Sequence, residues 1–199
     1  MSTPTRQRIV DAAFEALRTK GFSGASARAI AAIAEVNPGL LFYYFDTLDD
    51  LLLEALRQSS EERLVRHRAS LETAGSPAEL LALLRRMYRE DSDSGHIRVV
   101  SEMVAGSVAR PPLGGRVMAL MEPWVDLAEA GVKRATAGSP LAAFAEPREI
   151  ALAGVTFYLG ANLVTHLSDG TEAVDGLLAS AERAAGLLDL MGPPGAAPK

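Results

Sequence analysis

A short stretch near the amino terminus combines residue types that suit close contact with another surface. Residues 37–45 read Asn-Pro-Gly-Leu-Leu-Phe-Tyr-Tyr-Phe. Asn37 is a strong helix N-cap residue, and Pro38 suits the first helical position, where its missing N–H costs nothing. Gly39 then leaves a bare first turn that another molecule can approach closely. We therefore expect a short helix that begins at Pro38 and presents its front outward.

Two tyrosines in this stretch can supply hydroxyl donors. Leu41 and Phe45 are four residues apart and form the inward stripe, so Tyr43 and Tyr44 point elsewhere. Exposed hydroxyls of this kind hydrogen-bond phosphate oxygens, which positions a protein on a nucleic acid without reading its sequence. Packing in the core is the alternative for both rings, but Leu41 and Phe45 already occupy that face.

A helix this short needs support from a neighbour. Ser26 can cap a helix running to about Ala34, with Ile30 and Ala31 on its buried face. The turn at residues 35–36 would join the two helices. This arrangement is the helix-turn-helix, in which the second helix enters the major groove of DNA.

Residues 6–52 resemble the DNA-binding head of the tetracycline-repressor (TetR) family of bacterial transcriptional regulators. The match covers about a quarter of the chain, and the spacing of its anchors fits throughout. The matching residues are Arg8, Ile9, Val10, Asp11, Ala12, Ala13, Lys20, Gly21, Phe22, Ile30, Ala31, Val36, Gly39, Leu41, Phe42, Tyr43 and Phe45.

The resemblance implies a set of DNA contacts on the two short helices, with bases read from the first turn of the second helix and phosphates held by its two tyrosines. The contact residues are Arg28, Asn37, Pro38, Gly39, Leu40, Tyr43 and Tyr44. Family members often have lysine and serine or threonine where this chain has Pro38 and Leu40, and a lysine where it has Leu48. Few side chains are therefore available to read bases by hydrogen bonding. Leu40 offers only apolar contact, for instance with a thymine methyl.

Composition bounds the remaining possibilities. The 199 residues suffice for one or two domains with a real core, and 48% of them are apolar. No cysteine is present, and no apolar run approaches eighteen residues, so we expect a cytoplasmic protein without a signal peptide or membrane span. The net charge is −5, yet residues 1–45 hold five basic and three acidic residues. A mildly basic head on an acidic body suits a modular DNA binder.

Helical periodicity predicts an all-α chain, since no segment alternates with the period of a strand. We expect a helix-turn-helix domain at 1–47, a helical ligand-binding and dimerisation domain at 48–191, and a disordered tail at 192–199. Beyond the head, helices are expected at about 48–73, 77–90, 96–109, 116–137, 147–168 and 171–191. Residues 91–95 and 111–115 are expected to be loops.

The last two predicted helices are more apolar than one small core requires. Family members dimerise by packing these helices against their copies in a four-helix bundle, so we expect a homodimer. Packing within the chain is the alternative. The expected interface residues are Ile150, Gly154, Ala161, Val164, Leu177, Ala181, Ala184 and Leu188.

A small-molecule effector site is the second expectation for the body. Tyr158, Asn162 and His166 recur at intervals of four along an apolar helix, and methionine and aromatic walls are typical of pockets. Ordinary core packing explains any one of these residues equally well. The candidate lining is Met103, Ser107, Met118, Met121, Trp124, Phe157, Tyr158, Asn162 and His166. The three histidines are too scattered to indicate a metal site, and nothing indicates a cofactor.

The sequence therefore predicts a ligand-responsive transcriptional regulator, most simply a repressor. It would bind a palindromic double-stranded DNA operator as a dimer and be released by a small, largely hydrophobic effector. The alternative is a helical small-molecule-binding protein or enzyme whose head no longer binds specific DNA. No nucleophile–base pair, carboxylate pair or phosphate-binding glycine loop supports an enzyme. The operator, the effector and the regulated genes are not specified by the sequence.

Overall fold

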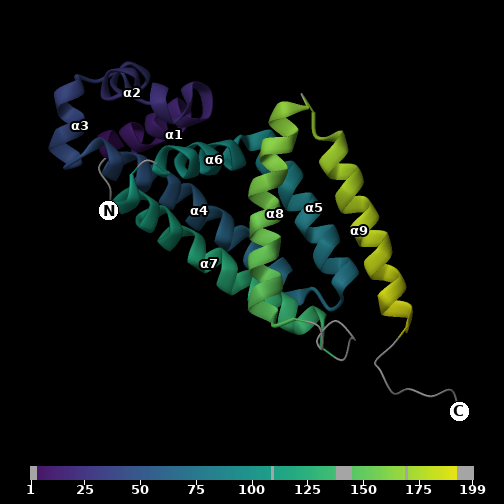
Figure 1. The fold of residues 1–199 in the computed structure, drawn as a ribbon. Helices are drawn as coiled ribbons and strands as arrows, with labels where there is room; N and C mark the ends of the chain where they lie inside the picture. Colours follow the sequence, from purple (N-terminus) through teal and green to yellow (C-terminus); the bar gives the residue numbers. More distant parts are fainter. Residues whose placement is uncertain (1–3, 109, 138–144, 169, 192–199) are drawn as a thin grey trace, which may run out of the picture. The chain divides into compact units, whose positions relative to one another are not determined.

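The computed structural model describes residues 4–108, 110–137, 145–168 and 170–191. Within these ranges the regular structure is nine α-helices and no strand, as the periodicity predicts (Figure 1). The helices are α1 (Pro4–Gly24), α2 (Ala27–Ala34), α3 (Pro38–Tyr44), α4 (Leu48–Thr73), α5 (Pro77–Ser94), α6 (His96–Ser107), α7 (Pro111–Ala135), α8 (Pro147–Leu167) and α9 (Glu172–Met191). The predicted disordered tail at 192–199 lies outside the described residues.

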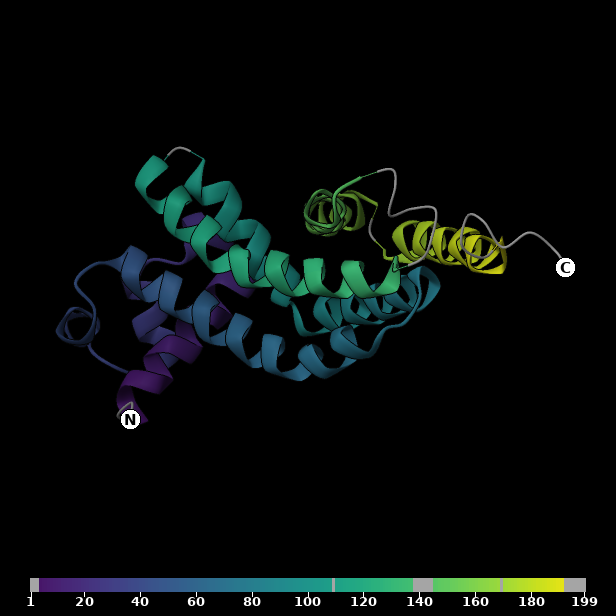
Figure 2. The same cartoon turned by 90° about the horizontal axis from the view of Figure 1, so that it is seen from below.

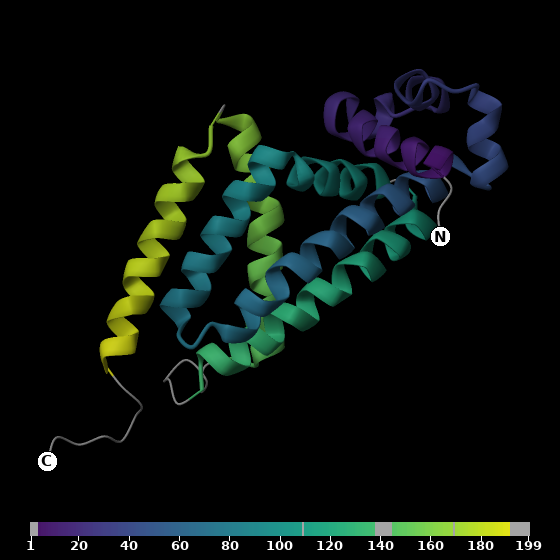
Figure 3. The same ribbon diagram turned by 180° about the vertical axis from the view of Figure 1, so that it is seen from behind.

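The chain divides into two units, whose boundaries pass through α4 and α7. The first comprises residues 1–63 and 94–121, and the second residues 64–93 and 122–199. In the first unit, α1 packs against α2 on one side and α6 on the other (Figures 1 and 3). The buried stripe of α1 includes Ile9, Ala13 and Leu17, none of which has accessible surface.

Four predicted helix starts are confirmed by their capping hydrogen bonds. The side chains of Ser26, Asn37, Thr47 and Ser76 accept from the backbone N–H groups of Ala29, Gly39, Asp50 and Glu79 at 3.2, 2.9, 3.1 and 3.2 Å. Each bond satisfies an N–H that has no partner inside its helix. The amino termini of α2 to α5 are therefore encoded locally.

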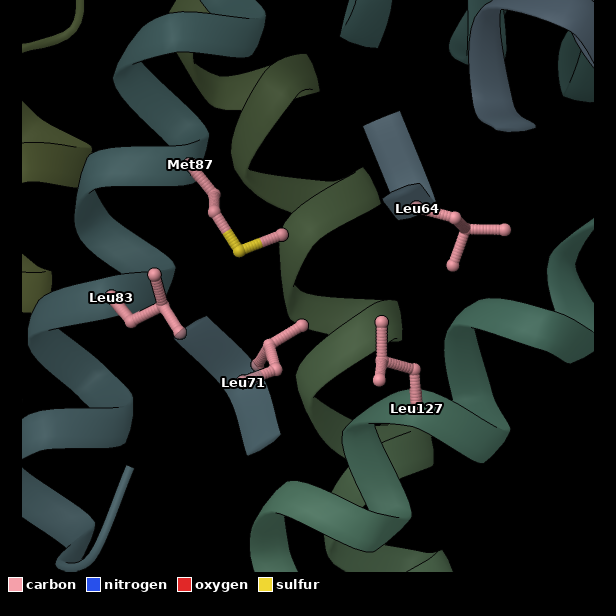
Figure 4. Packing of buried hydrophobic residues seen from close by; sticks show 5 residues of the cluster. All are labelled: Leu64, Leu71, Leu83, Met87 and Leu127. Atoms are coloured by element: carbon pink, nitrogen blue, oxygen red, sulfur yellow. The ribbon is translucent and has the colours of Figure 1, made fainter. Parts of the chain in front are cut away.

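The second unit encloses a compact apolar cluster from three helices. Its members are Leu64 and Leu71 of α4, Leu83 and Met87 of α5, and Leu127 of α7 (Figure 4). Leu80 and Trp124 pack against this cluster and are partly buried. Further along the chain α8 packs with α9, and Figure 2 views α8 nearly along its axis.

Two predicted loops are helical instead. α7 begins at Pro111 rather than near residue 116, because proline is tolerated in a first helical turn and the carbonyl of Arg110 accepts from Leu113 and Gly114. α5 continues through Asp91 to Ser94. Its polar residues there indicated a loop, but Asp91 is buried and accepts a hydrogen bond from Tyr158 of α8.

Candidate nucleic-acid interface and effector cluster

The support for α3 comes from behind, through two apolar side chains. Leu41 is 1% exposed and Phe45 is 7% exposed, as the spacing predicts. The preceding turn at Glu35 adopts a left-handed conformation with φ of 53°, and the Val36 N–H donates to the Ala31 carbonyl at 3.0 Å. This tight turn connects α2 to α3. The local geometry is the predicted helix-turn-helix.

One face of α3 is open. Pro38, Gly39, Phe42 and Tyr43 are all exposed, and their spacing places them on the same side of the helix. Tyr43 is 78% exposed and Phe42 54%, whereas Leu40 and Tyr44 are half-buried. The rings of Tyr43 and Tyr44 meet edge to face, with centroids 5.0 Å apart.

Gly39 is not required by the fold. A Cβ built at this position would meet only the Oδ1 of Asn37, at 3.3 Å, and φ is not in the left-handed region. The bare turn therefore leaves room for something outside the chain. Arg28, in the first turn of α2, is exposed as well. Among the predicted contacts, the structure exposes Arg28, Asn37, Pro38, Gly39 and Tyr43.

Phe42 was missed by the sequence analysis as a candidate contact. Its position four residues after Pro38 was the available signal, because that spacing places both residues on one face. In the sequence, Phe42 stands out only as an anchor of the family resemblance. Its 54% exposure is unusual for a side chain of this size and makes it part of the open face.

Polar contacts attach α1 to α4 within the first unit. Arg6 donates to Glu54 at 3.0 Å and lies over the ring of Phe45, while Gln7 donates to Gln58 at 2.7 Å. Arg57, with Gln58 and Arg6, lowers the pKa of the Glu54 carboxyl to about 2. Phe45, which supports α3 from behind, therefore also contacts Arg6 near the start of α1.

A second attachment joins the end of α1 to α6. The Phe22 N–H donates to the Glu102 carboxylate at 2.8 Å, and the Arg110 guanidinium covers the Phe22 ring at 5.1 Å. Gly106 lies under the same ring, because a Cβ there would be 2.2 Å from its Cγ. Phe22 is therefore held between α6 and Arg110. A displacement of α6 would therefore move the end of α1 through these contacts with Phe22.

The candidate effector residues fall in both units. In the first unit Met103, Ser107 and Met121 are buried, whereas Met118 is 46% exposed. In the second unit Trp124, Phe157, Tyr158 and Asn162 are all half-buried. The side chain of His166 lies outside the described part of the structure. Whether the two sets line one site stays a prediction.

A polar cluster between α5 and α8 was not predicted. The Tyr158 hydroxyl donates to Asp91, the hydroxyls of Tyr88 and Thr165 lie 2.6 Å apart, and the two tyrosine rings meet edge to face at 5.6 Å. Asp91 is 2% exposed, and burial raises its pKa to about 8. Asp91 was not predicted as part of a buried cluster because residues 91–95 were expected to form a loop.

The exposed faces of α8 and α9 are largely apolar and include several small residues. On α8 the open stripe is Leu152, Ala153, Thr156, Gly160, Leu163, Val164 and Leu167, and on α9 it is Ala173, Gly176, Leu177, Ser180, Arg183, Ala184 and Leu187. Of the predicted interface residues, Val164, Leu177 and Ala184 are exposed and Ile150, Gly154 and Ala181 are half-buried. Ala161 is only 4% exposed within the single chain, so the open stripe does not include it. The side chain of Leu188 lies outside the described residues.

Two glycines on these stripes have open space where a side chain would lie. A Cβ built at Gly160 or at Gly176 would meet nothing within 4 Å. Neither glycine is therefore required by packing within the chain, although glycine costs an exposed helix about 1 kcal/mol relative to alanine. Small residues of this kind allow another helix to approach closely.

Two features are absent from the described residues. No group of three or more metal-ligating side chains occurs among them. None of the helices in that part of the chain is sufficiently long and apolar to cross a membrane.

Comparison with known proteins places this geometry in a family. Residues 9–55 match the model of the bacterial regulatory proteins of the tetR family. A solved structure described as a member of the TetR family, from Streptomyces coelicolor A3, superposes with a TM-score of 0.65 and 29% identity, over 90% of this chain and 98% of that one. Residues 9–55 are therefore a tetR-family domain, and the chain as a whole is similar to a solved TetR-family member over most of its length. The family and its relatives are transcription regulators and not enzymes.

Two further relatives of this TetR-family chain differ in coverage. The HTH-type transcriptional regulator UidR of Escherichia coli K12 is 36% identical over 69 residues, which is 35% of each chain. The match therefore spans about a third of that curated relative. The multidrug binding protein EbrR, solved in complex with imidazole, is 28% identical with a TM-score of 0.62, over 90% of this chain and 96% of that one.

Proposed function

We propose that this TetR-family chain is a DNA-binding transcriptional repressor that acts as a homodimer and is released by a small, largely hydrophobic effector. The observation that carries the proposal is the open face of α3. The fold holds this helix from behind through Leu41 and Phe45 and leaves Gly39 and Tyr43 exposed on its front. A bare glycine and a tyrosine hydroxyl suit the approach of a DNA backbone.

The roles within this face follow from chemistry. Tyr43 and Tyr44 donate hydroxyl hydrogen bonds to phosphates, and the Arg28 guanidinium pairs with a phosphate or a base edge. In the proposed complex, Asn37, Pro38 and Leu40 lie at the entrance to the major groove of DNA. The mildly basic head keeps the acidic body from dominating the local field.

Dimerisation is supported by the apolar stripes on α8 and α9. Leu163 is 61% exposed, Leu177 56% and Leu187 65%, and such an extended apolar surface is uncommon on a monomer. One short helix reads too few base pairs for useful specificity, whereas two heads read a palindrome. The expected operator has half-sites about 34–36 Å apart, one turn of DNA.

Release by an effector requires a path from the body to the head. The two attachments of α1, through Glu54 on α4 and Glu102 on α6, supply it. A ligand that binds one arrangement of α4 and α6 more tightly than the other shifts the population of heads competent for DNA. EbrR is described as a multidrug binding protein, which supports a small-molecule effector for a chain of this architecture.

The test is selection of bound duplexes from a randomised DNA library at fixed salt. The wild-type protein should enrich a near-palindrome, and Gly39→Glu should abolish enrichment by bringing bulk and negative charge to the open face. Gly115→Glu is the control for added bulk and charge at an exposed glycine, since a Cβ at Gly115 meets nothing within 4 Å. Wild type without any preferred sequence, or Gly39→Glu that binds normally, would favour the alternative of a helical ligand-binding protein that no longer reads DNA.

An effector is found by thermal-shift screening and checked by release of the selected duplex. Trp124, the single tryptophan, should change its fluorescence when a ligand binds beside the apolar cluster that it contacts. A ligand that releases DNA, leaves this emission unchanged and tolerates both Phe157→Ala and Asn162→Ala would place the site elsewhere.

A further inference from the structure

The open face of α3 lacks the groups that usually read bases by hydrogen bonding. Between Pro38 and Tyr44 the sequence is Pro-Gly-Leu-Leu-Phe-Tyr-Tyr, without a charged residue, an amide, a serine or a threonine. Its only side-chain donors are the two tyrosine hydroxyls. The proposed function assigns those hydroxyls to phosphates. Any sequence preference that α3 itself contributes must therefore come from something else on this face.

Asn37, at the cap, cannot supply the missing readout. An asparagine discriminates adenine by pairing with N6 and N7 together, which requires its carbonyl and its amide at once. Here the carbonyl oxygen Oδ1 accepts from the Gly39 N–H at 2.9 Å, which holds that oxygen against the first turn of the helix instead of toward a base edge. The remaining Nδ2 is a lone donor, and guanine, adenine and thymine all present acceptors in the major groove. A single donor does not distinguish among those three bases.

The remaining surface of α3 is apolar. Phe42 is 54% exposed, on the same face as Pro38 and Gly39, and Leu40 is half-buried beside them. Only one base carries an apolar group on its major-groove edge, and that group is the C5-methyl of thymine. The bare Gly39 allows the helix to approach closely enough for such a contact.

We propose that Phe42 is a specificity-determining residue that reads thymine C5-methyl groups, with Leu40 as its neighbour on the helix. The inference rests on the proposed DNA binding and refines it. The preferred half-site is defined by where its thymine methyls lie rather than by a pattern of hydrogen-bond donors and acceptors. A base that carries a methyl at the same place, such as 5-methylcytosine, satisfies the contact in part.

The experiment uses the full-length protein and the duplex that it selects from the randomised library. That duplex is synthesised with deoxyuridine in place of thymine, one position at a time, so that only the methyl is removed. At least one substitution per half-site should weaken wild-type binding about fourfold, the factor expected for one methyl lost from a buried contact. Phe42→Ala should bind thymine and uracil duplexes equally at that position. Arg28→Ala is the matched control and should keep the thymine preference while binding all duplexes more weakly.

Each possible result either supports or overturns the assignment of thymine recognition to Phe42. Wild-type binding that is indifferent to uracil at every position, yet selective among bases, overturns the inference and leaves the proposed function intact. A thymine preference that survives in Phe42→Ala and is lost in Leu40→Ala overturns the assignment to Phe42. Failure of the wild-type protein to select any duplex refutes the proposed function itself. The uracil comparison on wild type needs no variant, so it holds even if Phe42→Ala folds poorly.

Discussion

Replacing Asp91 by asparagine should change how the stability of this protein depends on pH. Burial raises the pKa of this carboxyl from its ordinary 3.8 to about 8 in the folded chain. Between these values the native state holds a proton that the unfolded chain releases. The contribution of Asp91 to the free energy of unfolding therefore falls as pH rises from about 4 to about 8, and is constant outside that window.

The size of the effect follows from the pKa. One pKa unit corresponds to about 1.4 kcal/mol, so wild type should lose roughly 4 kcal/mol of stability between pH 5 and pH 8 through this one group. Water penetration and the Tyr158 hydroxyl, which stabilises the ionised form, reduce that figure. Asparagine keeps an acceptor for Tyr158 but cannot ionise. Asp91→Asn should therefore remove this part of the pH dependence.

The assay is urea unfolding of wild type and Asp91→Asn at pH 5 and pH 8. The difference between the two proteins isolates Asp91, because the titration of the three histidines is common to both. Asp93→Asn, an exposed aspartate on the same helix, is the control and should follow wild type. Parallel stability curves for wild type and Asp91→Asn would refute the reasoning, since they would mean that Asp91 ionises as it does in water.

Three further predictions follow from the contacts. Gly106→Ala should lower the free energy of unfolding by about 1–3 kcal/mol in urea, because its Cβ would lie 2.2 Å from the Phe22 ring; unchanged stability would contradict the packing. Leu163→Arg should give folded monomers in sedimentation, because Leu163 is 61% exposed, and a persistent dimer would exclude this stripe. Tyr43→Phe should weaken binding to all DNA sequences by about 1 kcal/mol, the value of one hydrogen bond, and a loss confined to one base step would argue against a phosphate contact.

Local signals in the sequence were sufficient for the head. Asn37 and Ser26 act as caps in the structure because capping depends on residues two or three positions away. The inward placement of Leu41 and Phe45 follows from helical spacing alone. Such short-range preferences operate before any tertiary contact forms, so the helix-turn-helix was predictable at the level of single residues.

The same reasoning failed where distant helices decide the outcome. The polar run from Asp91 to Ser94 indicated a loop, yet it is helical, and Tyr158, 67 residues away, donates a hydrogen bond to Asp91. Helix α7 starts at Pro111 because the burial of Leu113 and Val117 stabilises its first turns. The prolines and glycines around these residues give no indication of that burial in the sequence. In both cases tertiary contacts override local propensity.

The stripes on α8 and α9 show most clearly which features the sequence determines and which depend on the tertiary structure. That both helices are broadly apolar was evident from the sequence by itself, and so was their position at the end of the chain. Which side of each helix stays open was decided by the tertiary structure: Ala161 is buried, and Leu163 is exposed two positions further on. An apolar residue carries no sign of whether its own chain or another will cover it. Only the packing of the remaining helices determines which side of α8 is already occupied.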